Sequence, residues 1–448
     1  MLIQAPVRPY QPVALHLPPD PPADLPVCIG PAAILRRVWH GGDLGALTRA
    51  LVLGAEIGAP GAVLDLATLL MTQGGELARE GLEMQANVLA LARSFAIRPG
   101  AGFTVLAFVT TGDFMANTPI DFLLAGRDVT LILHYVDAEI DSLDDLPSHD
   151  IAFLAVAESP ENAPVLARME QLLSAHPGPV LNGHAARIAQ LTREGVAAAL
   201  QGIPGLLVPQ VERLTRNALL LRGVDAPALL RPIGSHAGEG LVRIETADEA
   251  ADWLSDTNAR ELTLTPFVDY RDAEGYFVKY RIVLIAGVAF ASHMAVSRHW
   301  MVHYLNAEMT DHADRRLKEA SWMAGFEAFA ARHGQALGMI ADRLGLDYLG
   351  LDCAEMPDGR LVLFEADVAM IVHDLDDAGL FPYKKPVMRR LFAGFEAALR
   401  GEARRAGPWE AIRVQAKAEW DRCGGAHPLL PPSCPNHPPQ ISHGGLGV

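Results

Sequence analysis

Three acidic side chains are spaced to meet on one face of a β-hairpin in the segment YLGLDCAEMPDGRLVLFEADVAM, residues 348–370. Two strand-like patterns flank an Asp-Gly dipeptide at 358–359, which is typical of a two-residue hairpin turn. Such a turn places Asp352 directly opposite Glu365, with Asp367 diagonal to them on the same face. Opposed side chains in a ribbon of this kind lie about 4.5–5.5 Å apart at Cβ. We therefore expect the three carboxylates to form one cluster.

Carboxylates this close to one another predict a cation between them. Two like charges at that separation repel, so one must bind a proton unless a positive charge lies between them. Hard oxygen ligands on rigid strands suit Mg²⁺, which also keeps water and phosphate oxygens in its shell. The alternative is an exposed ribbon whose acids are merely solvated. Apolar residues in the same ribbon, such as Leu349, Leu351 and Leu363, favour a packed sheet.

A second stretch, LLRPIGSHAGEGLVRI at 229–244, joins two apolar strand-like runs through a glycine-rich loop. Its glycine spacing fits neither the dinucleotide fingerprint nor the Walker A loop. Glycines permit close backbone approach and positive φ, so the N–H groups of this loop could fold over a polyphosphate. Arg231, on the strand that enters the loop, could neutralise it, and an ordinary flexible β-turn is the alternative. The loop residues of this hypothesis are Gly234, Ser235, His236, Gly238 and Gly240.

Composition limits the class of protein. The 448 residues carry a formal net charge of −16, which disfavours a nucleic-acid or anionic-membrane partner, because binding phosphate needs clustered Lys and Arg. No apolar run reaches about 18 residues, so no membrane span is expected. The Pro-rich N-terminal stretch lacks an apolar core, so we expect no secretory signal. Four cysteines in so long a chain do not indicate a disulfide framework, and a cytoplasmic setting is the expectation.

The hydrophobic pattern divides the chain into five regions and predicts a fold of the α/β and α+β classes. Strands that alternate with helices indicate a parallel sheet in the third region, and a series of strands dominates the fourth. These strands are NALLLRG, PALLRPI, GLVRIET, ELTLTPFVDY, YFVKYRIVLIAG and VAFASHMAV, followed by a long helical segment. The regions are a Pro-rich lead-in (1–28), a helical region (29–98), an α/β domain (99–205), a strand-rich domain (206–404) and a tail expected to be disordered (405–448).

The helical region contains apolar residues at i, i+3 and i+4 spacing on both sides of Gly74-Gly75. This pattern predicts a helical hairpin, which resembles a tetratricopeptide unit. A plain helical cap is an equal alternative, because no clean repeat is visible.

Residues from about 103 to 398 resemble the ATP-grasp superfamily, the carboxylate–amine ligases and their relatives, and within it the RimK-like branch. The resemblance implies a pre-ATP-grasp α/β domain followed by a two-lobed ATP-grasp domain, with ATP and Mg²⁺ or Mn²⁺ as cofactors. It is carried by PVLNGHAARIAQLTREGVAAALQGIPGLLVP, RPIGSHAGEGL, LTPFVDY, KYRIVLIAG, the later VHYLNAEM and LDCAEMPDGRLVLFEADVAM.

The resemblance also implies roles for individual residues. Asp352, Glu365 and Asp367 would hold the metal. The hinge strand would bind adenine through its backbone. The remaining nucleotide-binding candidates are Arg193, Arg231, the glycine loop, Pro266, Phe267, Val268, Asp269 (for the ribose) and Lys279.

Several positions depart from the family pattern. The family usually has Lys where Arg193 and Arg231 stand, and Arg keeps the charge and can bind phosphate bidentately. Its last metal ligand is usually Asn where this chain has Asp367, which adds negative charge. The RimK-like branch tends to carry an acid where this chain has Lys279, and an acid often precedes the hinge aromatic where this chain has Pro266.

By resemblance, ATP would phosphorylate a substrate carboxylate, and an amine would then attack the acyl phosphate to form an amide or peptide bond. Arg281 and Arg298 are candidates to bind the acyl phosphate or the carboxylate. The substrate, a small molecule or a peptide, would border Asn306, His373 and Lys384. For Lys384 the alternative is a solvated loop, and for the histidines near residue 300 it is a structural role in the core.

Two other function classes stay open. An ATP-grasp kinase would leave the phosphate on its product, and a noncatalytic scaffold would bind ATP without turnover. A peptide or carrier partner at the helical region, and a homodimer, are further expectations. The tail residues Cys423, His427, Cys434 and His437 have a spacing close to a zinc arrangement, but no regular element fixes them.

Overall fold

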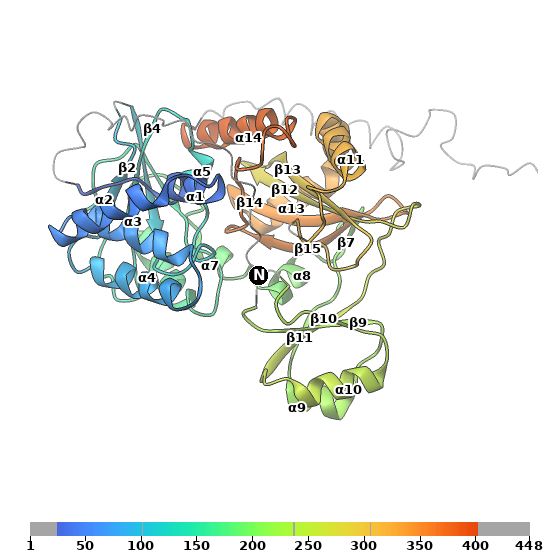
Figure 1. Cartoon of the computed structure of the whole chain (residues 1–448). Coiled ribbons are helices and arrows are strands. Elements are labelled where there is room, and N and C mark those ends of the chain that lie inside the picture. Colours follow the sequence, from blue (N-terminus) through green and yellow to red (C-terminus); the bar gives the residue numbers. More distant parts are fainter. Residues whose placement is uncertain (1–24, 101, 236–237, 305, 402–448) are drawn as a thin grey trace, which may run out of the picture.

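The computed structural model describes residues 25–100, 102–235, 238–304 and 306–401. In this part of the chain the strands form three β-sheets, of six, four and five strands. Figure 1 shows the first sheet with the N-terminal helices on one side of the molecule, and the other two sheets on the other side. The predicted class, α/β followed by α+β, is confirmed. The tail beyond residue 404, including its Cys and His residues, lies outside the described residues.

The first sheet has the order β1-β2-β4-β3-β5-β6 and is mostly parallel. β3 pairs in parallel with β4 and with β5, whereas β2 runs antiparallel to β4. Every residue of β4 and β5 is buried, which explains their largely apolar sequences. The strands are β1 (Val27–Cys28), β2 (Ser94–Ile97), β3 (Phe103–Val109), β4 (Val129–Tyr135), β5 (Ile151–Leu154) and β6 (Val180–Leu181).

The N-terminal helices pack on this sheet. The predicted hairpin is formed by α3 and α4, which flank Gly74-Gly75, and both glycines have positive φ. Leu64 of α3 and Val88 of α4 lie in one apolar cluster with residues of the sheet. The strands β1 and β2 belong to segments predicted as lead-in and as helix. The resemblance to a tetratricopeptide unit stays a prediction. The helices are α1 (Pro31–Trp39), α2 (Leu44–Glu56), α3 (Pro60–Met71) and α4 (Gly75–Val88).

Four further helices connect the strands of the first sheet and lead out of it. The last of them, α8, is capped by the Thr192 hydroxyl, which accepts a hydrogen bond from the Gly195 N–H. This cap starts the helix at Arg193 and so fixes where that side chain leaves the backbone. The helices are α5 (Ile120–Leu123), α6 (Ala163–Ser174), α7 (Ala185–Ile188) and α8 (Arg193–Leu200).

A small lobe follows, formed by a four-stranded sheet of order β10-β9-β11-β8. The segment NALLLRG, predicted as a strand, is instead the helix α9. The Thr215 hydroxyl caps its start and Gly223, at φ 79°, ends it. These capping residues indicate a helix, whereas the short apolar run alone fits either a helix or a strand. The elements are β8 (Glu212–Thr215), α9 (Arg216–Arg222), β9 (Ala228–Pro232), β10 (Val242–Ile244), α10 (Ala247–Asp256) and β11 (Glu261–Pro266).

The third sheet has the order β13-β12-β14-β15-β7. The long helical segment predicted after these strands is helical but broken into three pieces, and the last helix of the described residues begins at Lys384. The elements are β7 (Leu206–Leu207), β12 (Phe277–Ile285), β13 (Val288–Ser297), α11 (Ala313–Ala324), α12 (Phe326–Arg332), α13 (Gly334–Leu344), β14 (Tyr348–Glu355), β15 (Leu361–Asp367) and α14 (Lys384–Leu399).

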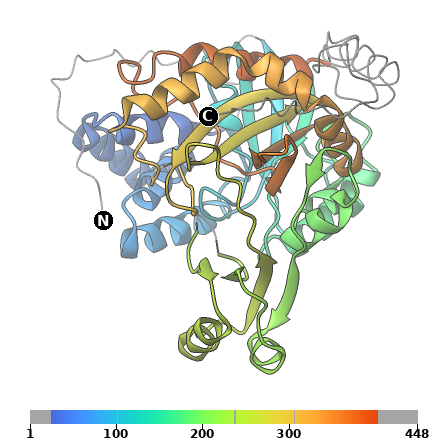
Figure 2. The same cartoon turned by 90° about the vertical axis from the view of Figure 1, so that its right-hand side faces the viewer.

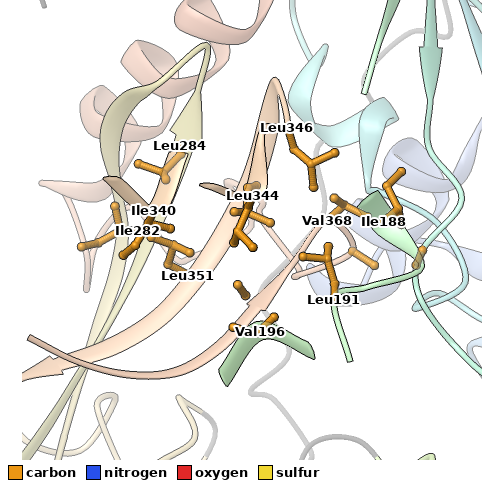
Figure 3. Close-up of a cluster of buried hydrophobic side chains, with 14 of the residues drawn as sticks. Ile188, Leu191, Val196, Ile282, Leu284, Ile340, Leu344, Leu346, Leu351 and Val368 are labelled. Atoms are coloured by element: carbon orange, nitrogen blue, oxygen red, sulfur yellow. The ribbon is translucent and has the colours of Figure 1, made fainter. Parts of the chain in front are cut away.

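One apolar cluster joins the third sheet to the first sheet and so fixes their relative position. It includes Leu106 and Phe108 of β3 together with Leu349 and Leu351 of β14. Figure 3 shows part of this cluster, to which β12, α13, α8 and the segments beside them contribute Ile282, Leu284, Ile340, Leu344, Leu346, Leu351, Val368, Ile188, Leu191 and Val196.

In both views the small lobe, with α9 and α10, projects from the larger body (Figures 1 and 2). Its own apolar cluster is separate from the large one and includes Leu219, Leu230 and Leu262. Among the described residues, no helix has both the length and the apolar character needed to cross a bilayer.

Candidate functional site

The acidic hairpin brings Asp352 opposite Glu365, as expected, but through a different turn. The predicted two-residue turn is wrong, because β14 ends at Glu355 and β15 begins only at Leu361. The Met356 N–H donates to the Arg360 carbonyl at 2.7 Å, and the bend between them starts with a Pro. Proline at this position favours a type I turn rather than the tight hairpin turn that Asp-Gly indicates.

A β-bulge restores the pairing that the longer turn would have shifted. On the turn side Cys353 pairs with Leu363, and on the other side Asp352 pairs with Glu365, so Phe364 is the extra residue. A one-residue slip would move side chains to the opposite face of the ribbon. The expected pairing is therefore correct because two departures from a regular hairpin cancel each other.

A cavity lies between the small lobe and the third sheet, and the acidic hairpin forms part of its wall. Eight of the lining residues were named from the sequence as nucleotide or metal candidates. They are Arg193, Arg231, Pro266, Phe267, Val268, Lys279, Asp352 and Glu365. The small lobe supplies Arg231 and Pro266, and the larger body supplies the charged residues that face them.

Asp352, which is almost fully buried, is held by two cations of β12. Arg281 donates Nε to Oδ1 at 2.8 Å and Nη2 to Oδ2 at 3.0 Å, and the Lys279 Nζ donates to Oδ2 at 2.8 Å. Burial raises the pKa of Asp352, but the charges of Arg281 and Lys279 outweigh it and hold this pKa well below its usual range. The remaining Arg281 contact is from Nη1 to the Ile371 carbonyl, at 3.0 Å.

The second carboxylate of the hairpin is paired as well. The Arg193 Nη2 lies 2.7 Å from Glu365 Oε1, so the start of α8 is tied to β15. Asp367, two residues further along β15, accepts a hydrogen bond from the Ala369 N–H. Burial, and then the nearby Glu365 charge, raise the pKa of Asp367 to about 6.

Glu365 and Asp367 fit a divalent cation, whereas Asp352 does not. Mg²⁺ in phosphate sites is commonly held by one or two carboxylates together with phosphate oxygens. Glu365 and Asp367 lie two residues apart on one face of β15, and of these two Glu365 lines the cavity whereas Asp367 lies just beyond its lining. Both oxygens of Asp352 already accept hydrogen bonds from fixed cations. In the part of the chain that the structure describes, no group of three or more His, Cys, Asp or Glu side chains has the arrangement of a metal site.

The glycine loop is folded by Arg231. Its guanidinium donates Nε to the Ser235 hydroxyl at 2.9 Å and contacts the Ser235 carbonyl, and that hydroxyl donates to the Pro232 carbonyl at 2.9 Å. Burial, and then the nearby Arg193 charge, lower the pKa of Arg231 to about 10, so it keeps its charge at neutral pH. His236 lies outside the described residues.

Positive φ angles at Gly234, Gly238 and Gly240 allow the loop to bend back toward the third sheet. A Cβ at Gly238 would lie 2.5 Å from the His303 Nε2 and 3.1 Å from the Met301 Sδ, so only a glycine fits there. The loop therefore covers the segment around residues 301–303.

The predicted hinge lines the cavity through Pro266, Phe267 and Val268. The Arg243 guanidinium lies 3.8 Å from the centre of the Phe267 ring, and the Trp300 ring meets the same ring edge-on. Asp269, proposed for a ribose, is instead paired with Arg271, with 2.9 Å between Nε and Oδ1, and it does not line the cavity.

Three other sequence candidates do not line the cavity. Arg298 stacks on the Tyr276 ring at 4.3 Å, on the hairpin that precedes β12. Asn306 closes its own loop, since its side chain bonds the His303 N–H and the Met301 carbonyl. His373 lies against the rings of Trp39 and Phe122 and accepts a hydrogen bond from the Leu375 N–H.

Lys384 is neither solvated nor part of the cavity. It is 3% exposed, and its Nζ lies 3.0 Å from Asp376 and 3.4 Å from Glu319, beside the Tyr304 hydroxyl. Lys384 is therefore the cation of a core ion pair at the start of α14, and it is not available to a substrate.

Two further residues have perturbed pKa values: His303, one of the histidines near residue 300 already considered in the sequence, and Glu158, which sequence reasoning did not single out. Burial, and then the Lys279 charge, lower the pKa of His303 to about 4, so this cavity residue is neutral at pH 7. Burial, and then Asp367, raise the pKa of Glu158 to about 7. An acid four residues after the end of the buried strand β5 was the available indication for Glu158, because strand ends of a parallel sheet often carry functional groups.

No protein-family model matches the sequence, and no curated protein gives a significant match. Solved structures do match in part. An ATP-grasp RimK domain protein from Sphaerobacter thermophilus is 17% identical, with a TM-score of 0.38, over 66% of this chain and 100% of that chain. The VanG D-Ala:D-Ser ligase from Enterococcus faecalis is 11% identical, with a TM-score of 0.42, over 68% and 100%. The D-alanine–D-alanine ligase from Bacillus anthracis, complexed with ATP, is 12% identical, with a TM-score of 0.42, over 70% and 99%.

Proposed function

We propose that this chain is an ATP-dependent ligase that activates a carboxylate as an acyl phosphate and joins it to an amine. The observation that carries the proposal is the cavity between two sheets on which Arg193, Arg231 and Lys279 converge. Against these three cations the lining has two carboxylates, Asp352 and Glu365. A cavity wall with an excess of positive charge suits a polyphosphate.

The apolar part of the cavity would hold the base. Phe267, Trp300 and Phe364 line it together with aliphatic side chains, which favours a flat, mostly apolar group such as adenine. The glycine loop, already held by Arg231, would close over the phosphates. When bound, a divalent ion would neutralise phosphate charge, and Glu365 and Asp367 would hold it.

The reaction proceeds in two balanced steps. A carboxylate oxygen of the substrate attacks the γ-phosphorus, so that a P–O bond forms and ADP leaves. The amine nitrogen then attacks the acyl carbon, phosphate leaves, and the nitrogen loses a proton. Fixed cations stabilise the charge that develops on the phosphoryl oxygens, and here these are the side chains of Arg193, Arg231 and Lys279.

Hydroxylamine tests the proposal, because it traps an acyl phosphate as a hydroxamate. The purified chain is incubated with ATP, Mg²⁺, hydroxylamine and pools of small acids or peptides. Hydroxamate that forms together with ADP supports the ligase. A phosphorylated product without hydroxamate supports the kinase alternative, and ATP binding without turnover of any pool supports the scaffold.

A variant pair ties the activity to the cavity. Arg193→Ala removes a charged hydrogen-bond donor and is expected to weaken ATP binding by about 10- to 100-fold. Arg213→Ala is the matched control, since Arg213 lies on β8, pairs with Glu261 and does not line the cavity. Equal ATP affinities of the two variants would contradict the assignment of the site.

A further inference from the structure

Two adjacent strands hold a charge cluster whose composition is unusual for a metal site. Arg281 of β12 pairs directly with Asp352 of β14, and Lys279 lies two residues before it on the same face of β12. One buried carboxylate thus faces two cations, and both its oxygens are used. A carboxylate arranged in this way is an anchor for cations rather than an open ligand for a metal.

The two cations differ in how much of their bonding capacity is used. Arg281 donates to Asp352 and to the Ile371 carbonyl, and it does not line the cavity. Lys279 lines the cavity, and within the described residues it makes one hydrogen bond, to Asp352, whereas an ammonium group has three donors. The free capacity of this cluster therefore lies at the Lys279 Nζ, on the side of the cavity.

Burial makes the excess charge of this cluster significant. The Lys279 side chain is 13% exposed and the Arg281 side chain 17%, so water cannot solvate them fully. A partly buried positive charge without a paired anion lowers the stability of the protein, and a bound anion would remove this cost. The small lobe presents Arg231 to the same cavity, and no acidic side chain of that lobe lines it. An anion entering the cavity would balance the cluster.

We propose that Lys279 is a phosphate-binding cation built into the site, that Asp352 and Arg281 position it, and that a divalent metal is held by Glu365 and Asp367 without Asp352. The inference rests on the proposed nucleotide site and adds to it. It predicts that a nucleoside triphosphate binds this chain without a divalent ion, because Lys279 supplies positive charge that the ion would otherwise supply.

Calorimetric titration of the full chain with ATP, in EDTA and in Mg²⁺, tests the first part. We expect wild type to bind ATP in EDTA within about tenfold of its affinity in Mg²⁺. Lys279→Met should weaken binding in EDTA by about 10- to 100-fold, the worth of a charged hydrogen bond. The loss in Mg²⁺ should be smaller. Lys318→Met is the control, because Lys318 pairs with Asp272 and Glu274 outside the cavity.

Binding of Mn²⁺ alone, followed by electron paramagnetic resonance, tests the second part. Glu365→Gln should weaken Mn²⁺ binding at least tenfold, and Asp352→Asn should change it less than about threefold. The same Asp352→Asn variant should reproduce the loss of ATP affinity in EDTA, because Lys279 is no longer held in place. A role in folding alone would not separate these two readouts.

The outcomes distinguish this inference from the proposed function. ATP binding to wild type only in Mg²⁺, with Lys279→Met equal to wild type, overturns the inference and leaves the nucleotide site standing. Loss of Mn²⁺ binding in Asp352→Asn overturns the two-carboxylate assignment. Absence of ATP binding to wild type under both conditions overturns the proposed function itself.

Discussion

Two buried charge clusters of this chain have opposite compositions. At the cavity, the single carboxylate of Asp352 faces the cations Lys279 and Arg281. Beneath α14, the single cation of Lys384 faces the carboxylates of Glu319 and Asp376. The first cluster borders the cavity, whereas the second is closed off within the protein.

The two clusters differ in how far hydrogen bonds and ion pairs within the protein satisfy their buried charges. Glu319 is fully buried and accepts hydrogen bonds from the Met294 N–H and from the hydroxyls of Tyr304 and Tyr383, at 3.0, 3.1 and 2.7 Å. Burial raises the pKa of Glu319, and the charge of Lys384 opposes this shift. The closed cluster is thus satisfied from within, while the cavity cluster keeps a donor for a ligand. The closed cluster at Lys384 supports the structure, and we propose that the cavity cluster at Lys279 serves binding.

The largest expected effect follows from breaking the closed cluster. Lys384→Met leaves the buried Glu319 and the partly buried Asp376 without their cation, which should cost about 3–5 kcal/mol of unfolding free energy. Denaturant unfolding measures the change. Lys385→Met is the matched control, because the adjacent lysine is exposed and should change stability by less than about 0.5 kcal/mol. Wild-type stability of Lys384→Met would contradict the contrast between the clusters.

A third charge cluster, in which Glu355 pairs with Arg332 and His333, predicts that the stability of the protein depends on pH. Burial raises the pKa of Glu355, but hydrogen bonds from His333 and Arg332 outweigh it and hold this pKa at about 2. A depressed carboxylate pKa adds stability above the unfolded value near 4.5, and this stability is lost as the pH falls toward 2. Glu355→Gln should therefore lose up to about 3 kcal/mol at pH 7. Thermal unfolding should show the difference from wild type shrinking between pH 4.5 and 2. A difference that is independent of pH would exclude this cause.

The glycine loop provides a test at the mouth of the cavity. Gly238→Ala would push a Cβ into His303 and strain a backbone at φ 80°, so the loop should shift and ATP affinity should fall about tenfold, or about 1.4 kcal/mol. Gly287→Ala is matched in backbone, at φ 79°, but meets no atom within 4 Å. Its effect should be confined to stability. Competition with a fluorescent ATP analogue measures both variants, and equal affinities would place the loop outside the binding site.

The smallest expected effect concerns Arg298, a sequence candidate that does not line the cavity. Its guanidinium stacks on Tyr276 and its Nη2 lies 3.3 Å from the tyrosine hydroxyl. Arg298→Ala should lose about 0.5–1 kcal/mol of stability and leave ATP affinity within about twofold. A tenfold loss in the same titration would show that Arg298 reaches the nucleotide after all.

The acidic hairpin shows which structural features local sequence patterns predict and which they do not. Alternation of apolar residues correctly indicated the strands β14 and β15, because side-chain direction has a period of two along any strand. The Asp-Gly dipeptide indicated the wrong turn, and the bulge at Phe364 was not visible in the pattern. The pairing of Asp352 with Glu365 was thus predicted, but the packing that enforces it was not.

The sequence alone determined the positions of most strands, the glycine loop and the acidic residues, because turn chemistry and hydrophobic periodicity act over a few residues. Tertiary structure decided which charges meet. Lys279 and Asp352 are far apart in sequence, as are Lys384 and Glu319, and each pair forms only when strands or helices pack side by side. Burial then decides whether a charge is paired within the protein or left to pair with a ligand. The desolvation of a charge depends on all the surrounding elements rather than on neighbours in sequence.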